Sequence, residues 1–139
     1  RDYKVTGVQT CALPISKVVP HDFDMVINRN HDETTKCATM FHELGHYFAG
    51  HLGGYPENKH VADRRNEFLT TREMEFEAET ICYLVCERVG IRNPSAGYLH
   101  GYLNRNSMIP EGISIDTILK ATGKIERMLR PRYPLREKK

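Results

Sequence analysis

The 139-residue chain lacks long hydrophobic runs, a clear excess of one charge and regularly paired cysteines. Its longest strongly apolar run, Ile81 to Val85, is far too short to span a bilayer, and no secretory signal pattern is visible, so we expect no membrane association. The net charge of +2 is spread over the chain and does not by itself indicate nucleic-acid binding. Four cysteines without regular spacing argue against a disulfide scaffold and favour a reducing, cytoplasmic location. The length suffices for one domain.

The N-terminal segment has an unusual origin. Residues 5–15, VTGVQTCALPI, match codon by codon the translation of a short-read sequencing adapter. We therefore expect residues 1–16 to be non-native and residues 17–139 to form the domain. On this interpretation the natural protein extends further at its N-terminus.

The remaining pattern predicts one strand followed by helices. The strand is expected at Phe23–Asn28, where β-branched residues stand between polar ones. Helices are expected at Glu33–His51 after an Asp32 cap, Arg72–Val89, Pro94–Tyr102, and from a Ser114 cap to Leu129. This order predicts an α+β fold, mostly helical, with a small sheet truncated at its N-terminal side.

The motif HELGH lies on the first predicted helix. Residues four apart share a helix face, so His42 and His46 can present two imidazole nitrogens to one ion. Glu43 lies beside that face and can act as general base on a water molecule. The pattern is typical of helix-borne zinc hydrolase sites, although two surface histidines remain an alternative.

A catalytic zinc site usually needs a third protein ligand. The metzincin pattern would place a histidine at position 52, which is Leu52, and His51 is one residue short of it. Glutamates at the start of the next helix are the better source. Two of them, Glu75 and Glu79, share a face that continues into an apolar helix, so both should be partly buried and need a counter-charge.

We therefore predict Glu75 as the third zinc ligand and Glu79 as the partner of a ligand histidine's second nitrogen. The alternative is that such acids only favour the helix N-terminus, which we prefer for Glu73 and Glu77. Cys82 and Cys86 are expected to be packed thiols. His60 and His100 are possible donors to the reacting group, with a purely structural role the simpler interpretation.

Three stretches together resemble a known family. These are NRNHDETTKCATMFHELGHYFAGHLG, EFEAE and LVCERVGI. They are similar to the ImmA/IrrE-type metallo-endopeptidases, which are gluzincin-like and related to ArdC-type antirestriction protease domains. In that family the HExxH helix is followed by an E-x-x-A pattern whose glutamate binds zinc, which places the ligand at Glu75. Glu79 departs from the usual Asn or Asp.

The resemblance implies a zincin-like fold and a bacterial cytoplasmic zinc endopeptidase that cleaves a repressor-like or regulatory protein, often from a mobile element. It also implies a possible nucleic-acid-associated partner through a missing N-terminal domain. The alternative function is a metal-holding interaction module of an ArdC-like protein that cuts nothing. A further possibility is that the truncated sheet leaves an exposed edge and an unstable fragment.

Overall fold

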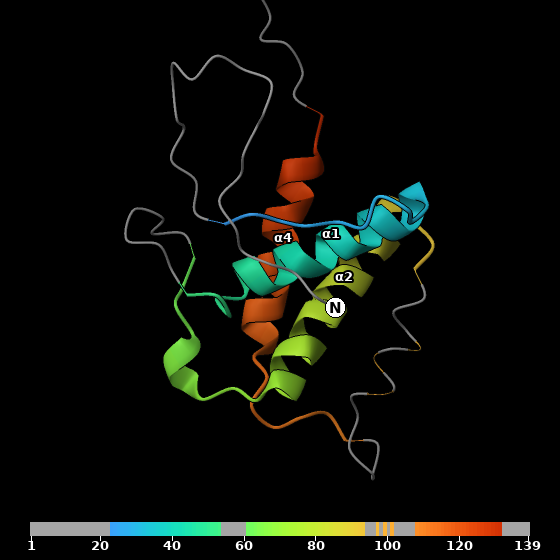
Figure 1. Cartoon of the computed structure of the whole chain (residues 1–139). Helices are drawn as coiled ribbons and strands as arrows, with labels where there is room; N and C mark the ends of the chain where they lie inside the picture. The colour runs from blue at the N-terminus through green and yellow to red at the C-terminus, as the bar shows by residue number, and fades with distance from the viewer. Residues whose placement is uncertain are drawn as a thin grey trace, which may run out of the picture.

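Three helices pack together in the part of the chain that the computed structural model describes, residues 23–53, 61–93, 97, 99, 101 and 108–131. They are α1 (Glu33–Phe48), α2 (Thr71–Val89) and α4 (Ile115–Leu129), with a 3-10 turn at Arg65–Glu67. Figure 1 shows α1 crossing over α2, with α4 beside both. None of the described helices has the length and apolarity needed to cross a membrane.

Each helix begins at a side-chain cap. The carboxylate of Asp32 accepts a hydrogen bond from Thr35 N at 2.8 Å at the start of α1. Thr70 and Glu73 form a reciprocal capping box on α2, and Ser114 caps α4. These caps satisfy backbone N–H groups that have no partner inside the helix. The predicted starts are confirmed to within one residue.

The helices bury one apolar face each in a shared core. Phe41 of α1, Ile81 and Val85 of α2, and Ile118 and Ile125 of α4 are at most 2% exposed and belong to one cluster. Burial of these side chains is the main force that holds the three helices together.

Small residues let α1 and α2 approach closely beneath the HELGH motif. A Cβ added to Gly45 would lie 3.1 Å from the backbone oxygen of Ala78, which is itself fully buried. Because neither residue carries a large side chain, the two helix backbones can come near enough for side chains on either side of the crossing to meet.

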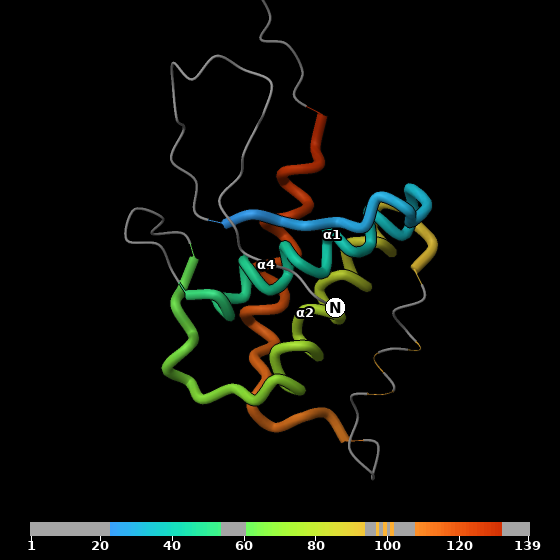
Figure 2. The backbone as a smooth tube through the Cα atoms, viewed as in Figure 1, coloured from blue at the N-terminus to red at the C-terminus, as the bar shows by residue number. Residues whose placement is uncertain are grey.

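The predicted small sheet is wrong for the described part of the chain, which contains no strand. The segment from Phe23 to Asn28 is extended but has no partner strand among these residues, and a strand needs a neighbour to complete its hydrogen bonds. Instead it runs beside α1 (Figure 2), where the Phe23 ring meets the Tyr47 ring edge-on at 5.6 Å between centroids. The described part of the chain is therefore all-helical and not α+β.

Two other predictions concern segments that the structure describes in part or not at all. Of the helix predicted at Pro94–Tyr102, residues 97, 99 and 101 are described and are helical. The adapter-like residues 1–16 lie outside the described residues.

Candidate metal centre

The histidines of HELGH lie one turn apart on α1 and face the same point. Their Nε2 atoms are 3.1 Å apart, and the rings meet edge-on with centroids 4.8 Å apart. His42 is 1% exposed and His46 is 3% exposed. Burial at the crossing of α1 and α2 removes these rings from water, so their nitrogens need partners within the protein.

The partner from α2 is the carboxylate of Glu75. Its Oε1 lies 3.2 Å from His46 Nε2 and its Oε2 lies 3.4 Å from His42 Nε2. Hydrogen bonds with His42 and then His46 hold the pKa of Glu75 well below its usual range and outweigh the effect of burial. The carboxylate is therefore ionised at neutral pH.

These three side chains fit a metal ion in both spacing and chemistry. Each offers a ligand atom, and all three atoms lie within 4.8 Å of one another. Zn–N and Zn–O bonds of about 2.0–2.1 Å at tetrahedral angles require ligand atoms roughly 3.3 Å apart, close to the separations given above. Among the described residues, no other group of three or more such side chains has this arrangement.

The contacts of the two His42 nitrogens are also compatible with a bound cation. Its Nδ1 lies 2.8 Å from Glu79 Oε1, while its Nε2 faces Glu75. A neutral imidazole carries one N–H and cannot donate to carboxylates at both nitrogens. When a metal ion binds Nε2, the proton of His42 lies on Nδ1, next to the carboxylate of Glu79. Glu79, 2% exposed, thus lies where the sequence analysis expected a partner of a ligand histidine.

Glu43 follows His42 on α1 and is 9% exposed. Helical geometry places it about 100° around the axis from His42, beside the face that carries the two histidines. Its position is compatible with the general-base role expected from the motif, with its side chain only slightly exposed to solvent.

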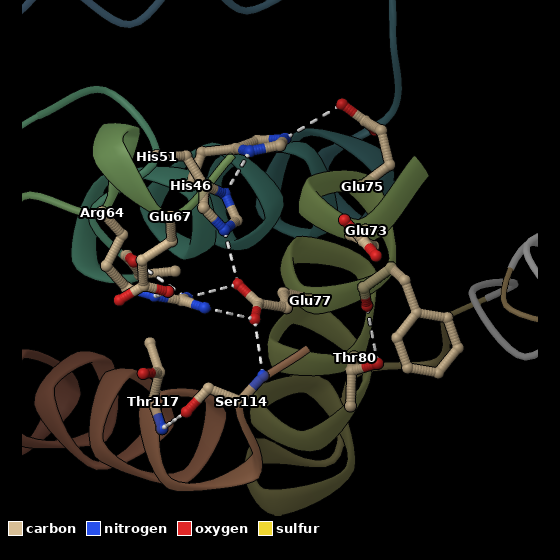
Figure 3. Close-up of polar contacts among 12 residues, drawn as sticks. His46, His51, Arg64, Glu67, Glu73, Glu75, Glu77, Thr80, Ser114 and Thr117 are labelled. Carbon is tan, nitrogen blue, oxygen red and sulfur yellow. Dashed lines mark hydrogen bonds and ion pairs between the residues drawn. The ribbon is translucent and has the colours of Figure 1, made fainter. Parts of the chain in front are cut away.

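A second buried cluster adjoins the histidine pair, and sequence reasoning missed it. Glu77 is fully buried and accepts hydrogen bonds from Arg64 Nη1 at 2.6 Å and Nη2 at 2.9 Å. His51 Nε2 lies 2.5 Å from Glu77 Oε2, and His51 Nδ1 lies 2.9 Å from His46 Nδ1 (Figure 3). The prediction that Glu77 only favours the helix N-terminus is therefore wrong. Glu73 does lie in the first turn of α2 as expected, and its side chain forms the capping box there.

Backbone geometry after α1 brings this cluster together. Gly50 has a φ of +79°, and a Cβ there would lie 2.0 Å from the backbone oxygen of Ala62. Arg64 N donates to Gly50 O at 3.0 Å, and its Nη1 donates to Ala49 O at 3.2 Å. A glycine is needed for this turn, because a side chain would collide with the returning segment. The helix predicted to reach His51 therefore ends at Phe48, and Gly50 is the sequence signal that indicates the turn.

Because Glu77 is buried beside Arg64 and His51, we expect the folded protein to lose stability in acid. Burial raises the pKa of Glu77, but hydrogen bonds from His51 and Arg64 outweigh it and lower the pKa to about 2 from 4.5. The folded state therefore keeps this carboxylate ionised while the unfolded state binds a proton. Stability from Glu77 is complete above pH 4.5 and is lost as the pH falls towards 2, by roughly 3 kcal/mol in total.

Urea unfolding at a series of pH values between 7 and 3 measures this effect. Glu77→Gln is expected to reduce the acid slope without abolishing it, because Glu75 also has a lowered pKa. The exposed Glu33 provides the control, and Glu33→Gln should leave the slope nearly unchanged. An equal slope in wild type and Glu77→Gln would contradict the prediction.

The remaining candidates from the sequence take no part in the described centre. Cys82 and Cys86 are buried in the core and form no disulfide, which confirms their expected packing role. A hydrogen bond with the Cys82 thiol, and then burial, raise the pKa of Cys86, so it is an unreactive thiol at neutral pH. His60 and His100 lie outside the described residues.

Two imidazoles on a helix and one carboxylate from the next are the ligand set of metallopeptidase-type metal sites. The chain belongs to the Peptidase_M78 family, described as the IrrE N-terminal-like domain, whose model matches residues 5–99. This membership confirms the resemblance to ImmA/IrrE-type proteins. The match begins within the adapter-like segment. Neither the curated proteins nor the solved structures include a significant match to the chain.

Proposed function

We propose that this chain is a zinc-dependent endopeptidase domain in which His42, His46 and Glu75 bind the metal ion and Glu43 is the general base. The observation that carries the proposal is the convergence of the two Nε2 atoms and the Glu75 carboxylate. Membership of a peptidase family supports the reaction class.

The chemistry divides between the ion and the protein. A bound zinc ion supplies a Lewis acid that polarises a peptide carbonyl and makes water more acidic at neutral pH. Glu43 accepts the proton of the attacking water and passes it to the nitrogen of the leaving amine. Glu79 holds His42 in the tautomer that leaves its Nε2 free for the ion, through the 2.8 Å contact.

The substrate in this proposal is a specific regulatory, repressor-like protein, and the setting is the bacterial cytoplasm, with carriage on a mobile element. The resemblance to ImmA/IrrE-type proteins supports these assignments. Cys37, Cys82 and Cys86 form no disulfide, which agrees with a reducing compartment. A nucleic-acid-associated partner has no support among the described residues, so the proposal is limited to a protein substrate.

The first test is the metal content of the purified chain. We expect about one zinc ion per wild-type chain and a large loss in Glu75→Ala, because two histidines alone leave a tetrahedral site without its third protein ligand. Elemental analysis after gel filtration, with circular dichroism to show that both proteins are folded, provides the measurement.

Glu87→Ala is the matched control, since Glu87 is an exposed glutamate on the same helix. It should bind zinc as the wild type does. Folded wild-type protein that takes up no zinc would refute the proposed function.

A further inference from the structure

The Nδ1 atoms of the two candidate ligand histidines have different partners. His42 contacts a carboxylate directly, through Nδ1 and Glu79. His46 is linked to a carboxylate through a second histidine. Its Nδ1 faces His51 Nδ1 at 2.9 Å, and His51 Nε2 contacts the carboxylate of Glu77.

Helix geometry explains why an extra residue stands in this position. At 100° per residue, Glu79 lies about 40° from Glu75 around the axis of α2, whereas Glu77 lies about 160° away. Glu77 therefore faces α4, where it accepts a hydrogen bond from Ser114 N at 2.8 Å. From that side it meets His46 only through His51, which lies just beyond the end of α1.

With a metal ion bound to His46, the donors and acceptors along this row have one consistent arrangement. A metal ion at His46 Nε2 leaves the proton on Nδ1, which donates to His51 Nδ1. His51 then carries its proton on Nε2 and donates it to Glu77. The carboxylate of Glu77 in turn accepts two hydrogen bonds from Arg64. Each donor along the row has an acceptor, and the negative charge has a cation.

The row is also rigidly held. The side chains of His51, Glu77 and Arg64 are at most 4% exposed. Arg64 is tied to the end of α1 by its bonds to Ala49 O and Gly50 O, and Glu77 is tied to the start of α4 by Ser114 N. Little rotational freedom remains for the His51 ring, so the ring can orient its neighbour.

We propose that His51, held by the buried Glu77–Arg64 pair, is a positioning residue that orients His46 and selects the tautomer able to bind the metal ion. The role rests on the proposed metal site. It makes the site depend on the segment after α1 and on the start of α4, besides the HELGH helix and α2. Partners of this kind typically change metal affinity by about 10- to 100-fold.

The test compares two replacements of His51, Asn and Leu, which have nearly the same shape as each other. Asn places an acceptor oxygen close to the position of the histidine Nδ1, whereas Leu has the same shape without it. We expect His51→Leu to weaken Zn²⁺ binding by about 10- to 100-fold, measured by competition with a chromophoric chelator, and His51→Asn to lose clearly less. The visible spectrum of the Co²⁺-loaded chain should change more in His51→Leu than in His51→Asn.

The outcomes distinguish a His51 that only fills space from a His51 that orients His46. Equal losses of affinity in the two variants, or affinities within about twofold of wild type in both, would overturn the positioning role while leaving the proposed metal site intact. Folded wild-type protein that binds neither Zn²⁺ nor Co²⁺ would overturn both. If His51→Leu does not fold, the smaller His51→Ala takes its place in the comparison, and His51→Asn is again expected to bind Zn²⁺ more tightly.

Discussion

Replacing Glu43 by Gln is expected to leave zinc bound and to lower kcat/KM for peptide hydrolysis by about 10²- to 10⁴-fold. Gln has nearly the shape of Glu but cannot accept a proton at neutral pH. Since Glu43 is not among the three converging ligand groups, its replacement should not change the metal content. A peptide selected from a library for cleavage by the wild type serves as the substrate, mass spectrometry measures the rate of its hydrolysis, and elemental analysis measures the zinc.

The same variant distinguishes the peptidase from a metal-holding interaction module. A module that cuts nothing has no need for a base at position 43, so Glu43→Gln would keep its biological effect. Glu87→Gln, on the exposed face of α2, is the control for unspecific effects of the substitution. Full hydrolytic activity in Glu43→Gln would show that another group accepts the proton.

The second large effect is expected at the buried ion pair. Arg64→Met should destabilise the fold by about 3–5 kcal/mol, because it leaves the fully buried Glu77 without its cation. Many domains have only about 5–15 kcal/mol of stability, so this variant will unfold at much lower urea concentration. Arg88→Met is the matched control. Arg88 pairs with Glu126 near the surface and is 69% exposed, so its loss should cost at most about 1 kcal/mol.

A double variant tests whether the uncompensated charge is the cause. In the Arg64→Met background, Glu77→Gln removes the negative charge and keeps an oxygen acceptor for one of the two other donors, Ser114 N or His51 Nε2. It should therefore recover part of the lost stability. If Arg64→Met costs no more than Arg88→Met, the pair contributes little and the structural role given to Glu77 is incorrect.

Much of the helical part of the fold was predictable because its signals are local. The caps at Asp32, Thr70 and Ser114 lie within three residues of the backbone groups they satisfy. The sheet prediction failed for a different reason. The residues from Phe23 to Asn28 favour an extended backbone, but a sheet depends on a second strand, which their own sequence cannot specify.

The sequence by itself determined the candidate ligand set. Four-residue spacing brings His42 and His46 to one face of α1, and the amphipathic start of α2 indicates a buried Glu75. Their role as metal ligands stays a prediction until the metal is measured. In each case the sequence determined which side chains share one face of a single helix, because the 3.6-residue repeat sets their directions.

Only the tertiary structure decided the partners of Glu77. His51 and Arg64 are 26 and 13 residues away from it in the chain, and no periodic pattern links them. They meet because Gly50 permits a tight turn after α1 and because the crossing at Gly45 and Ala78 sets the distance between the helices. A buried carboxylate must find its cation wherever packing places one, and that is a property of the folded chain as a whole.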